Sequence, residues 1–204
     1  MILSGVKMFN LKLRNKYLIS LVLTFGISTT SFASECDSKK LEPVFDLMVQ
    51  RTKLMEGVAA YKFTQKQQPY DAATELKVLS NVRKIAEDNK LDPSDLMVFA
   101  QIQMDQAKQV QQYWLNYWGS HPANQPDPAI TPGIDSLHQQ INAIDAKLYS
   151  KLIANLANLQ ICSQAEMRKQ MSAAYTGVRG IPSTPDYNSL TVSALSNISP
   201  TGQQ

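Results

Sequence analysis

The segment VFDLMVQRTKLMEGVAAYK, residues 44–62, has the spacing of an amphipathic helix. At about 100° per residue its apolar stripe consists of Val44, Leu47, Met48, Leu54, Met55 and Val58. Arg51 and Lys62 stand eleven residues apart, close to three whole turns, so both project from that stripe. Cations directed at a core must be paired or must hold an anionic ligand, because a bare buried charge is too costly. The segment therefore predicts a helical protein with a buried cationic pocket for a small anion.

The first 33 residues have the features of a signal peptide. Four basic residues precede an apolar run at 18–27, and Ser31-Phe32-Ala33 supplies the small residues for cleavage after Ala33. The run is shorter than the ~20 residues of a transmembrane helix, which makes an uncleaved membrane anchor the less favoured alternative. We therefore expect a periplasmic or secreted protein that has no membrane association after cleavage.

Removal of that peptide changes the charge balance. It leaves 171 residues with 16 basic and 17 acidic side chains, a formal net charge of −1. The basicity of the whole chain thus lies in the targeting segment, and nothing indicates a nucleic-acid partner. Two cysteines and two histidines remain, which is too few for a plausible metal site, so no metal is expected.

Both cysteines, Cys36 and Cys162, lie in the exported part of the chain. An oxidising compartment and an even count favour a disulfide between them. Two separately buried thiols are the alternative.

Helical patterns continue along the chain, and the alternation typical of strands is absent. The predicted helices cover residues 39–65, 71–89, 93–118, 133–160 and 163–178, with a four-proline loop at 119–132. From Arg179 on, Pro, Ser, Thr, Gly and Asn prevail, so we expect a flexible tail over 179–204. The predicted fold class is all-α, with a single domain at 34–178 of five helices, three of them long.

Polar side chains also interrupt the apolar faces of the second and third helices. Asp71 and Glu75 begin one face, and Gln111 lies at the centre of the other, with Gln103 expected at its boundary. Asp71 alone is explained by the preference of acids for a helix N-terminus. A buried ion pair or a bridging Gln is also more often structural than functional. Together, however, these groups on three consecutive helices predict one cavity at which four residues converge: Arg51, Lys62, Glu75 and Gln111.

The same positions carry a family resemblance. The string RTKLMEGVAAYK (51–62) is followed by PYD (69–71) and Glu75, by LDP (91–93) and by AKQVQ (107–111), with a weaker echo, IDSL, at 134–137. This pattern resembles the secreted all-helical chorismate mutases over about residues 41–160. The resemblance implies a chorismate mutase type II-like fold and the Claisen rearrangement of chorismate to prephenate. That reaction needs no cofactor, nucleophile or proton transfer.

The resemblance also implies roles for individual residues. Lys62 would bind a substrate carboxylate and the ether oxygen, and Gln111 would donate to the same ether oxygen. Arg51 would bind a carboxylate, and Glu75 would accept from the ring hydroxyl. The remaining substrate-binding positions would be Asp71, Thr74, Ala107 and Lys108.

Three positions depart from the family pattern. Thr74 stands where an Arg is usual, Ala107 where a Ser or Thr is typical, and Thr131 where the secreted branch has a further cation. Losing a charged contact to a buried carboxylate costs roughly 2–5 kcal/mol, so we expect weakened catalysis. Neighbouring cations could substitute, with Lys108 the best placed among Lys77, Arg83, Lys108 and Arg168.

Two other functions stay open. A non-catalytic relative that binds a small carboxylate or a protein partner is favoured by the missing arginines. A lyase on the same fold, removing pyruvate from isochorismate, gains no support from export. A homodimer is compatible with the family but is not fixed by the sequence.

Overall fold

The computed structural model describes residues 35–182 and 185–202, so the predicted signal peptide at 1–33 lies outside the described residues. The described part contains α-helices and two short 3₁₀ helices but no β-strand. The predicted all-α class is confirmed. In chain order the elements are η1 (Ser38–Leu41), α1 (Glu42–Thr64), α2 (Ala72–Asp88), α3 (Pro93–Ser120), η2 (Pro122–Asn124), α4 (Ile134–Ala154), α5 (Leu156–Ile161), α6 (Gln164–Ala174) and α7 (Pro185–Asn197).

The helix starts follow local sequence signals. Asp71 caps α2 by accepting a hydrogen bond from the Thr74 backbone N–H at 3.0 Å. Asp92 caps α3, and Pro93 occupies the first helical position, where its missing N–H has no cost. These caps fix where the helices that carry the polar residues begin.

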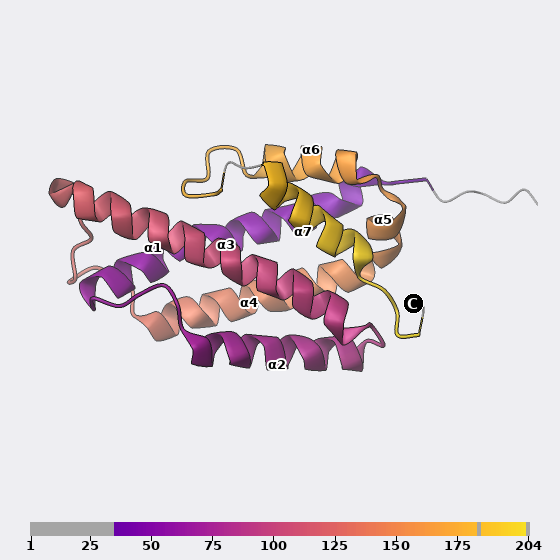
Figure 1. The fold of residues 1–204 in the computed structure, drawn as a ribbon, viewed down its shortest axis with the longest axis horizontal. Helices are drawn as coiled ribbons and strands as arrows, with labels where there is room; N and C mark the ends of the chain where they lie inside the picture. The colour runs from indigo at the N-terminus through magenta and orange to yellow at the C-terminus, as the bar shows by residue number, and fades with distance from the viewer. Residues whose placement is uncertain (1–34, 183–184, 203–204) are drawn as a thin grey trace, which may run out of the picture. The chain divides into compact units, whose positions relative to one another are not determined.

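Helix α1 is central, because it packs against both α3 and α4. It runs parallel to α3, as the contacts of Arg51 with Gln103 and of Phe63 with Trp118 show. Helix α2 packs along α3, while Figure 1 shows α6 and α7 on the other side of the bundle from α2. The polar face of α1 is therefore surrounded by three long helices.

Helices α1 and α4 run antiparallel and approach closely at a glycine. A Cβ built on Gly57 would lie 3.0 Å from Cδ2 of Leu137. Any larger residue at 57 would push α4 away from α1 unless the Leu137 side chain moved. Six residues further back along α1, Arg51 forms an ion pair with Asp145 of α4.

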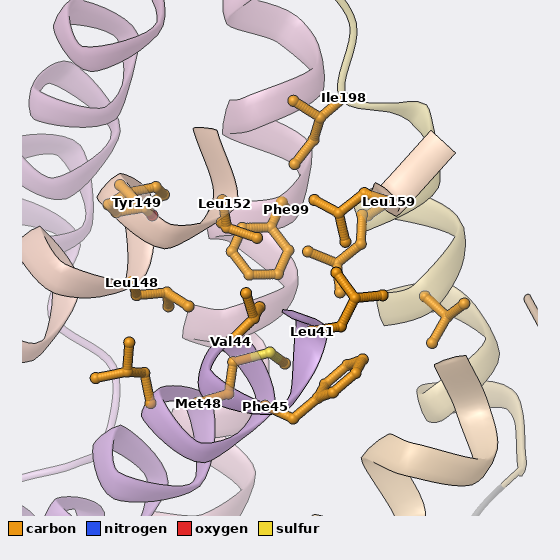
Figure 2. Packing of buried hydrophobic residues seen from close by; sticks show 14 of the residues in the cluster. Leu41, Val44, Phe45, Met48, Phe99, Leu148, Tyr149, Leu152, Leu159 and Ile198 are labelled. Atoms are coloured by element: carbon orange, nitrogen blue, oxygen red, sulfur yellow. The ribbon is translucent and has the colours of Figure 1, made fainter. Parts of the chain in front are cut away.

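The largest apolar cluster surrounds the N-terminal half of α1. Phe45 and Met48 of α1 meet Phe99 of α3 and Leu152 of α4, with Ile198 closing the cluster (Figure 2). All five are essentially inaccessible to water. This packing anchors α1, α3 and α4 at one end of the bundle and positions the polar groups further along α1.

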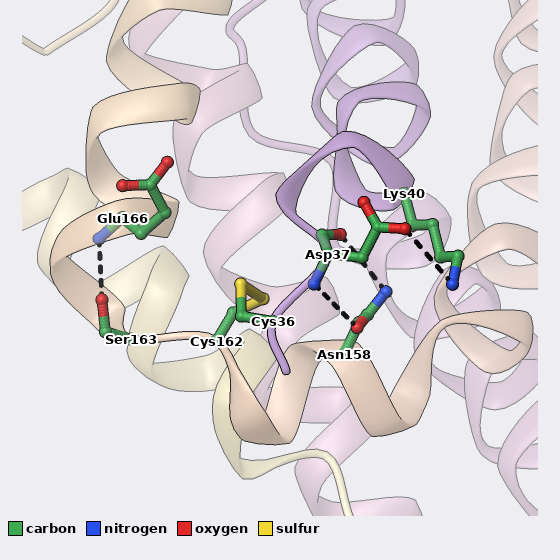
Figure 3. Close-up of a disulfide and its surroundings, with 7 residues drawn as sticks. All are labelled: Cys36, Asp37, Lys40, Asn158, Cys162, Ser163 and Glu166. Carbon is green, nitrogen blue, oxygen red and sulfur yellow. Dashed lines mark hydrogen bonds and ion pairs between the residues drawn. A yellow bond between two sulfur atoms is a disulfide. The ribbon is translucent and has the colours of Figure 1, made fainter. Parts of the chain in front are cut away.

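The predicted disulfide is confirmed. Cys36 and Cys162 are bonded, which links the segment before η1 to the end of α5 (Figure 3). Next to the bridge, Asp37 and Asn158 exchange two hydrogen bonds of 3.4 and 3.3 Å between backbone and side-chain amide. The bridge and the amide pair together secure the start of the described chain.

Two of the predicted boundaries are wrong. The helix expected over 133–160 is interrupted at Asn155, whose side-chain amide donates to the carbonyl of Lys151 at 2.9 Å. The segment expected as a flexible tail contains α7, which packs against α3, α5 and α6. Val192 and Leu195 of α7 are completely buried. Tertiary packing, rather than helix propensity, stabilises this Ser- and Thr-rich helix.

The contribution of α7 can be measured with Leu195→Ala. Leu195 is 0% exposed, so removing its methyl groups leaves a cavity, which typically costs about 2–5 kcal/mol of unfolding free energy. Leu190→Ala is the matched control in the same helix, because Leu190 is 58% exposed. Urea denaturation should show a large loss for position 195 and little change for position 190. Equal effects would contradict the packing of α7.

The disulfide predicts a labelling pattern. Neither Cys36 nor Cys162 should react with a thiol reagent in the native protein until a reductant is added. Reduction should then lower the free energy of unfolding by up to ~4–5 kcal/mol on the chain-entropy model, because the bridge closes a long loop. Immediate labelling of the unreduced native protein would contradict the bridge.

Candidate active site

A cavity of about 400 Å³ lies between α1, α2, α3 and α4. Every residue that the sequence singled out as a site candidate contributes to its lining. These are Arg51, Lys62, Asp71, Thr74, Glu75, Ala107, Lys108 and Gln111. The fold thus brings together residues that are up to sixty positions apart in the chain.

Arg51 is 7% exposed and is held by two helices. Its Nε donates to Oδ1 of Asp145 at 2.9 Å, and its Nη1 donates to the backbone carbonyl of Gln103 at 3.4 Å. The counter-ion of Arg51 is therefore Asp145 of α4, and not Asp71 or Glu75 at the start of α2. This ion pair keeps the buried charge compensated.

Lys62 is 9% exposed and lies eleven residues further along α1 than Arg51. Its Nζ donates to the carbonyl of Pro69 at 2.7 Å. Burial lowers the pKa of Lys62, an effect that the nearby charges of Asp71 and Glu75 oppose. No carboxylate of the described chain lies within ion-pair distance of its ammonium group, which faces the cavity with a neutral partner.

Asp71 and Thr74 form part of the cavity rim at the start of α2. The Asp71 carboxylate accepts from both the backbone N–H and the hydroxyl of Thr74, at 3.0 and 2.8 Å. These hydrogen bonds hold the pKa of Asp71 below its usual value. The pair therefore serves first as a helix cap, as the position of Asp71 suggested.

Glu75 and Lys108 face each other across the cavity wall. The Lys108 ammonium lies 3.2 Å from a carboxylate oxygen of Glu75 and 2.9 Å from one of Asp105. Burial would lower the pKa of Lys108, but the hydrogen bonds and charges of Asp105 and Glu75 raise it overall. The substitute cation that the sequence favoured is thus present in the cavity but is already paired with two acids.

Gln111 is 5% exposed and poorly satisfied. Its Nε2 contacts only the sulfur of Met55 at 3.7 Å, and its Oε1 has no partner among the described residues. Gln103, expected at the boundary of its helix face, is buried as well. A buried amide without partners is costly, so the Gln111 amide is available to a ligand in the cavity.

The residues of α4 that line the cavity were not predicted from the sequence. His138, Asn142 and Asp145 all line the cavity. Their spacing of four and three residues puts them on one face of the helix, a signal that the apolar stripe of α4 obscured. Of the three family departures, Thr74 and Ala107 line the cavity. Thr131 is not part of the lining, and its hydroxyl donates to the carbonyl of Asp127 in the loop before α4.

A second hollow of about 430 Å³ lies on another face of α1. Glu56, Trp114 and Arg179 contribute to its lining. Burial raises the pKa of Glu56, although the charge of Arg179 opposes that effect. Both Glu56 and Lys53 of this hollow are exposed, so it lacks the buried cations of the first cavity. We therefore place the candidate site in the cavity of Arg51 and Lys62.

The cavity is a cation-bearing pocket inside an all-helical domain. Among residues 35–182 and 185–202, no cluster of His, Cys, Asp and Glu has the arrangement of a metal site. The polar residues that line the cavity carry charged groups, amides, hydroxyls and an imidazole.

Comparison with known proteins agrees with this description. The family model for chorismate mutase type II matches residues 42–112, which span α1, α2 and most of α3. The predicted resemblance to the all-helical chorismate mutases is thereby confirmed. The matched segment includes every residue assigned a role by that resemblance.

Solved structures extend the likeness over most of the chain. The secreted chorismate mutase from Yersinia pestis is 20% identical, with a TM-score of 0.65, over 81% of this chain and 99% of that one. The chorismate mutase from Burkholderia thailandensis is 24% identical over 77% of this chain and 99% of that one, with a TM-score of 0.62. That from Burkholderia phymatum is 17% identical over 79% and 96%, with a TM-score of 0.63. At these identities the likeness establishes the shared fold.

The burial of Lys62 predicts a gain in stability when its charge is removed. The pKa of Lys62 is lowered from 10.5, so burial disfavours the charged form in the folded state. The unfolded chain therefore binds more protons, and wild-type stability should rise as the pH rises through the alkaline range towards 10.5. Lys62→Met should increase the free energy of unfolding at neutral pH, and the increase should shrink at alkaline pH.

Urea denaturation of both proteins at neutral pH and near pH 10 measures this difference. Lys53→Met, at an exposed position of the same helix, is the control and should change stability little. A Lys62→Met protein that is less stable than wild type at neutral pH would contradict the unfavourable burial of the charge.

Proposed function

We propose that this chain is an exported chorismate mutase that converts chorismate to prephenate by electrostatic stabilisation. The observation that carries the proposal is that Lys62 and Gln111, both more than nine-tenths buried, line one cavity together with Arg51. The match of residues 42–112 to the family model supports the same activity. Chorismate is therefore the proposed substrate, without a cofactor.

The arrangement of the donors suits a Claisen rearrangement. As the C–O bond breaks, negative charge grows on the ether oxygen of the substrate. A preorganised ammonium of Lys62 and the amide of Gln111 would stabilise that charge more in the transition state than in the substrate. Arg51 would bind a carboxylate and hold the flexible chain of the substrate in a folded geometry. Glu75, which keeps lone pairs beyond its bond to Lys108, would accept from the ring hydroxyl.

Four cations and three carboxylates line the cavity, which gives it a formal net charge of +1 when His138 is neutral. The cations are Arg51, Lys62, Lys77 and Lys108, and the carboxylates are Asp71, Glu75 and Asp145. A dianionic substrate would therefore enter a pocket that compensates only part of its charge. We infer weakened catalysis from this balance and from Thr74 and Ala107 in place of the usual donors.

Export to the periplasm or the medium is the second element of the proposal. The signal-like segment at 1–33 and the Cys36–Cys162 disulfide support it, because structural disulfides persist in oxidising compartments. Within the described ranges, no helix is long and apolar enough to cross a membrane. A similar protein from Yersinia pestis is described as secreted.

A non-catalytic carboxylate-binding protein is the second candidate function. The observation in its favour is that Arg51 is already paired with Asp145, which leaves less positive charge for a ligand. A protein of this kind would bind a small carboxylate in the same cavity without stabilising a transition state.

The direct test follows the loss of chorismate with the protein lacking residues 1–33. Wild type should remove chorismate faster than the uncatalysed background. Lys62→Ala should lower kcat by about 10²–10³-fold, since it removes a donor to the developing charge. Gln111→Ala should also lower kcat.

Lys53→Ala is the matched control, because Lys53 lies exposed on the same helix outside this cavity. It should retain the wild-type rate. A wild-type rate equal to the background, with saturable binding of chorismate, would favour the binding protein over the enzyme. Unchanged turnover in Lys62→Ala would remove that residue from the site.

A further inference from the structure

The carboxylate of Asp145 is an unexpected member of a pocket built for an anion. It lines the cavity and lies 2.9 Å from Nε of Arg51, with only 17% of its side chain exposed. It comes from α4, beyond residues 42–112 that match the family model. An acid at this position repels an incoming carboxylate and so weakens the binding of an anion. We therefore expect another role of Asp145 that offsets this loss of affinity.

The hydrogen bonds of Arg51 suggest that role. A guanidinium carries five N–H donors in a rigid plane. One is used on Asp145 and one on the carbonyl of Gln103, and the others have no partner among the described residues. Two bonds from different helices fix both the position and the plane of the group. The remaining donors on the Nη atoms are then available to a ligand in the cavity.

The turn of α4 that follows Asp145 is firmly packed. Tyr149 lies one turn further along the helix, and burial raises the pKa of its hydroxyl. Tyr149 is itself buried and packs edge-on against Phe99, so the base of the α4 wall is rigid. Asp145 thus stands on a firmly packed turn, from which it can hold Arg51 in one orientation.

We propose that Asp145 is a positioning residue of this site: its oxygen fixes the Arg51 guanidinium towards the cavity, while its charge reduces the affinity for a dianionic substrate. This inference rests on the proposed function for its kinetic consequences. The geometric part, the hold on Arg51, does not depend on the identity of the substrate.

Two substitutions distinguish the effect of the hydrogen bond that Asp145 accepts from the effect of its negative charge. Asp145→Asn keeps an oxygen that can accept from Nε of Arg51 but removes the negative charge. It should lower KM for chorismate several-fold and leave kcat within about twofold. Asp145→Ala removes the acceptor as well, so Arg51 loses its orientation, and kcat should fall by about tenfold or more.

Asp135→Asn is the matched control. Asp135 lies exposed in the first turn of the same helix and outside the cavity lining, so this variant should keep both kinetic constants. If Asp145 had only a structural role, Asp145→Asn and Asp145→Ala would both lower the melting temperature. The two variants would then not differ in which kinetic constant, KM or kcat, they change. Wild-type kinetics in both variants, or equal losses of kcat in both, would overturn the proposal.

A second readout does not depend on turnover. The Nε–H of Arg51, assigned in ¹⁵N NMR spectra by its loss in Arg51→Lys, should give a slowly exchanging signal in wild type and in Asp145→Asn. It should broaden or disappear in Asp145→Ala. If wild type fails to convert chorismate, the proposed function fails, and this signal alone decides the role of Asp145. An unchanged Arg51 signal in Asp145→Ala overturns it.

Discussion

Two positive charges on the core-facing side of α1 are the constraint on which the rest of this structure depends. Arg51 and Lys62 are both more than nine-tenths buried, and neither can be left without compensation. The bundle compensates them differently: Arg51 receives a carboxylate and a carbonyl, whereas Lys62 receives a single carbonyl. These partners come from α4, from α3 and from the loop before α2, and the polar cavity lies among them beside α1.

The first half of α1 contributes mainly to stability, and the second half contributes to the candidate site. At its start, α1 packs in the large apolar cluster and is secured by the disulfide nearby. Further along α1, the ammonium of Lys62 and the buried amide of Gln111 on the neighbouring α3 have few partners, which is unfavourable for folding. Such groups persist where the surrounding structure stabilises them, and a ligand that engages them recovers the cost. This division is typical of a preorganised site on a rigid scaffold.

The fold class, the disulfide and the convergence of Arg51, Lys62 and Gln111 could be predicted from the sequence, because each leaves a local signal. Helical period places cations on an apolar stripe, and capping residues mark where helices begin. Asp145 could not be predicted, since it pairs with a residue 94 positions earlier and no local pattern encodes that contact. Helix α7 was missed for a related reason: its composition is that of a loop, and only its burial against α3 and α6 stabilises it.

If the proposed function is right, Arg51, Lys62 and Gln111 hold one small anion together. A titration of the isotope-labelled protein with prephenate, the proposed product, followed by NMR at the side-chain nitrogens of these three residues, measures this directly. All three signals should shift and saturate with a single dissociation constant, and Lys62→Met should abolish the shift at Gln111. Signals that do not move, or that move with different dissociation constants, would contradict a shared site.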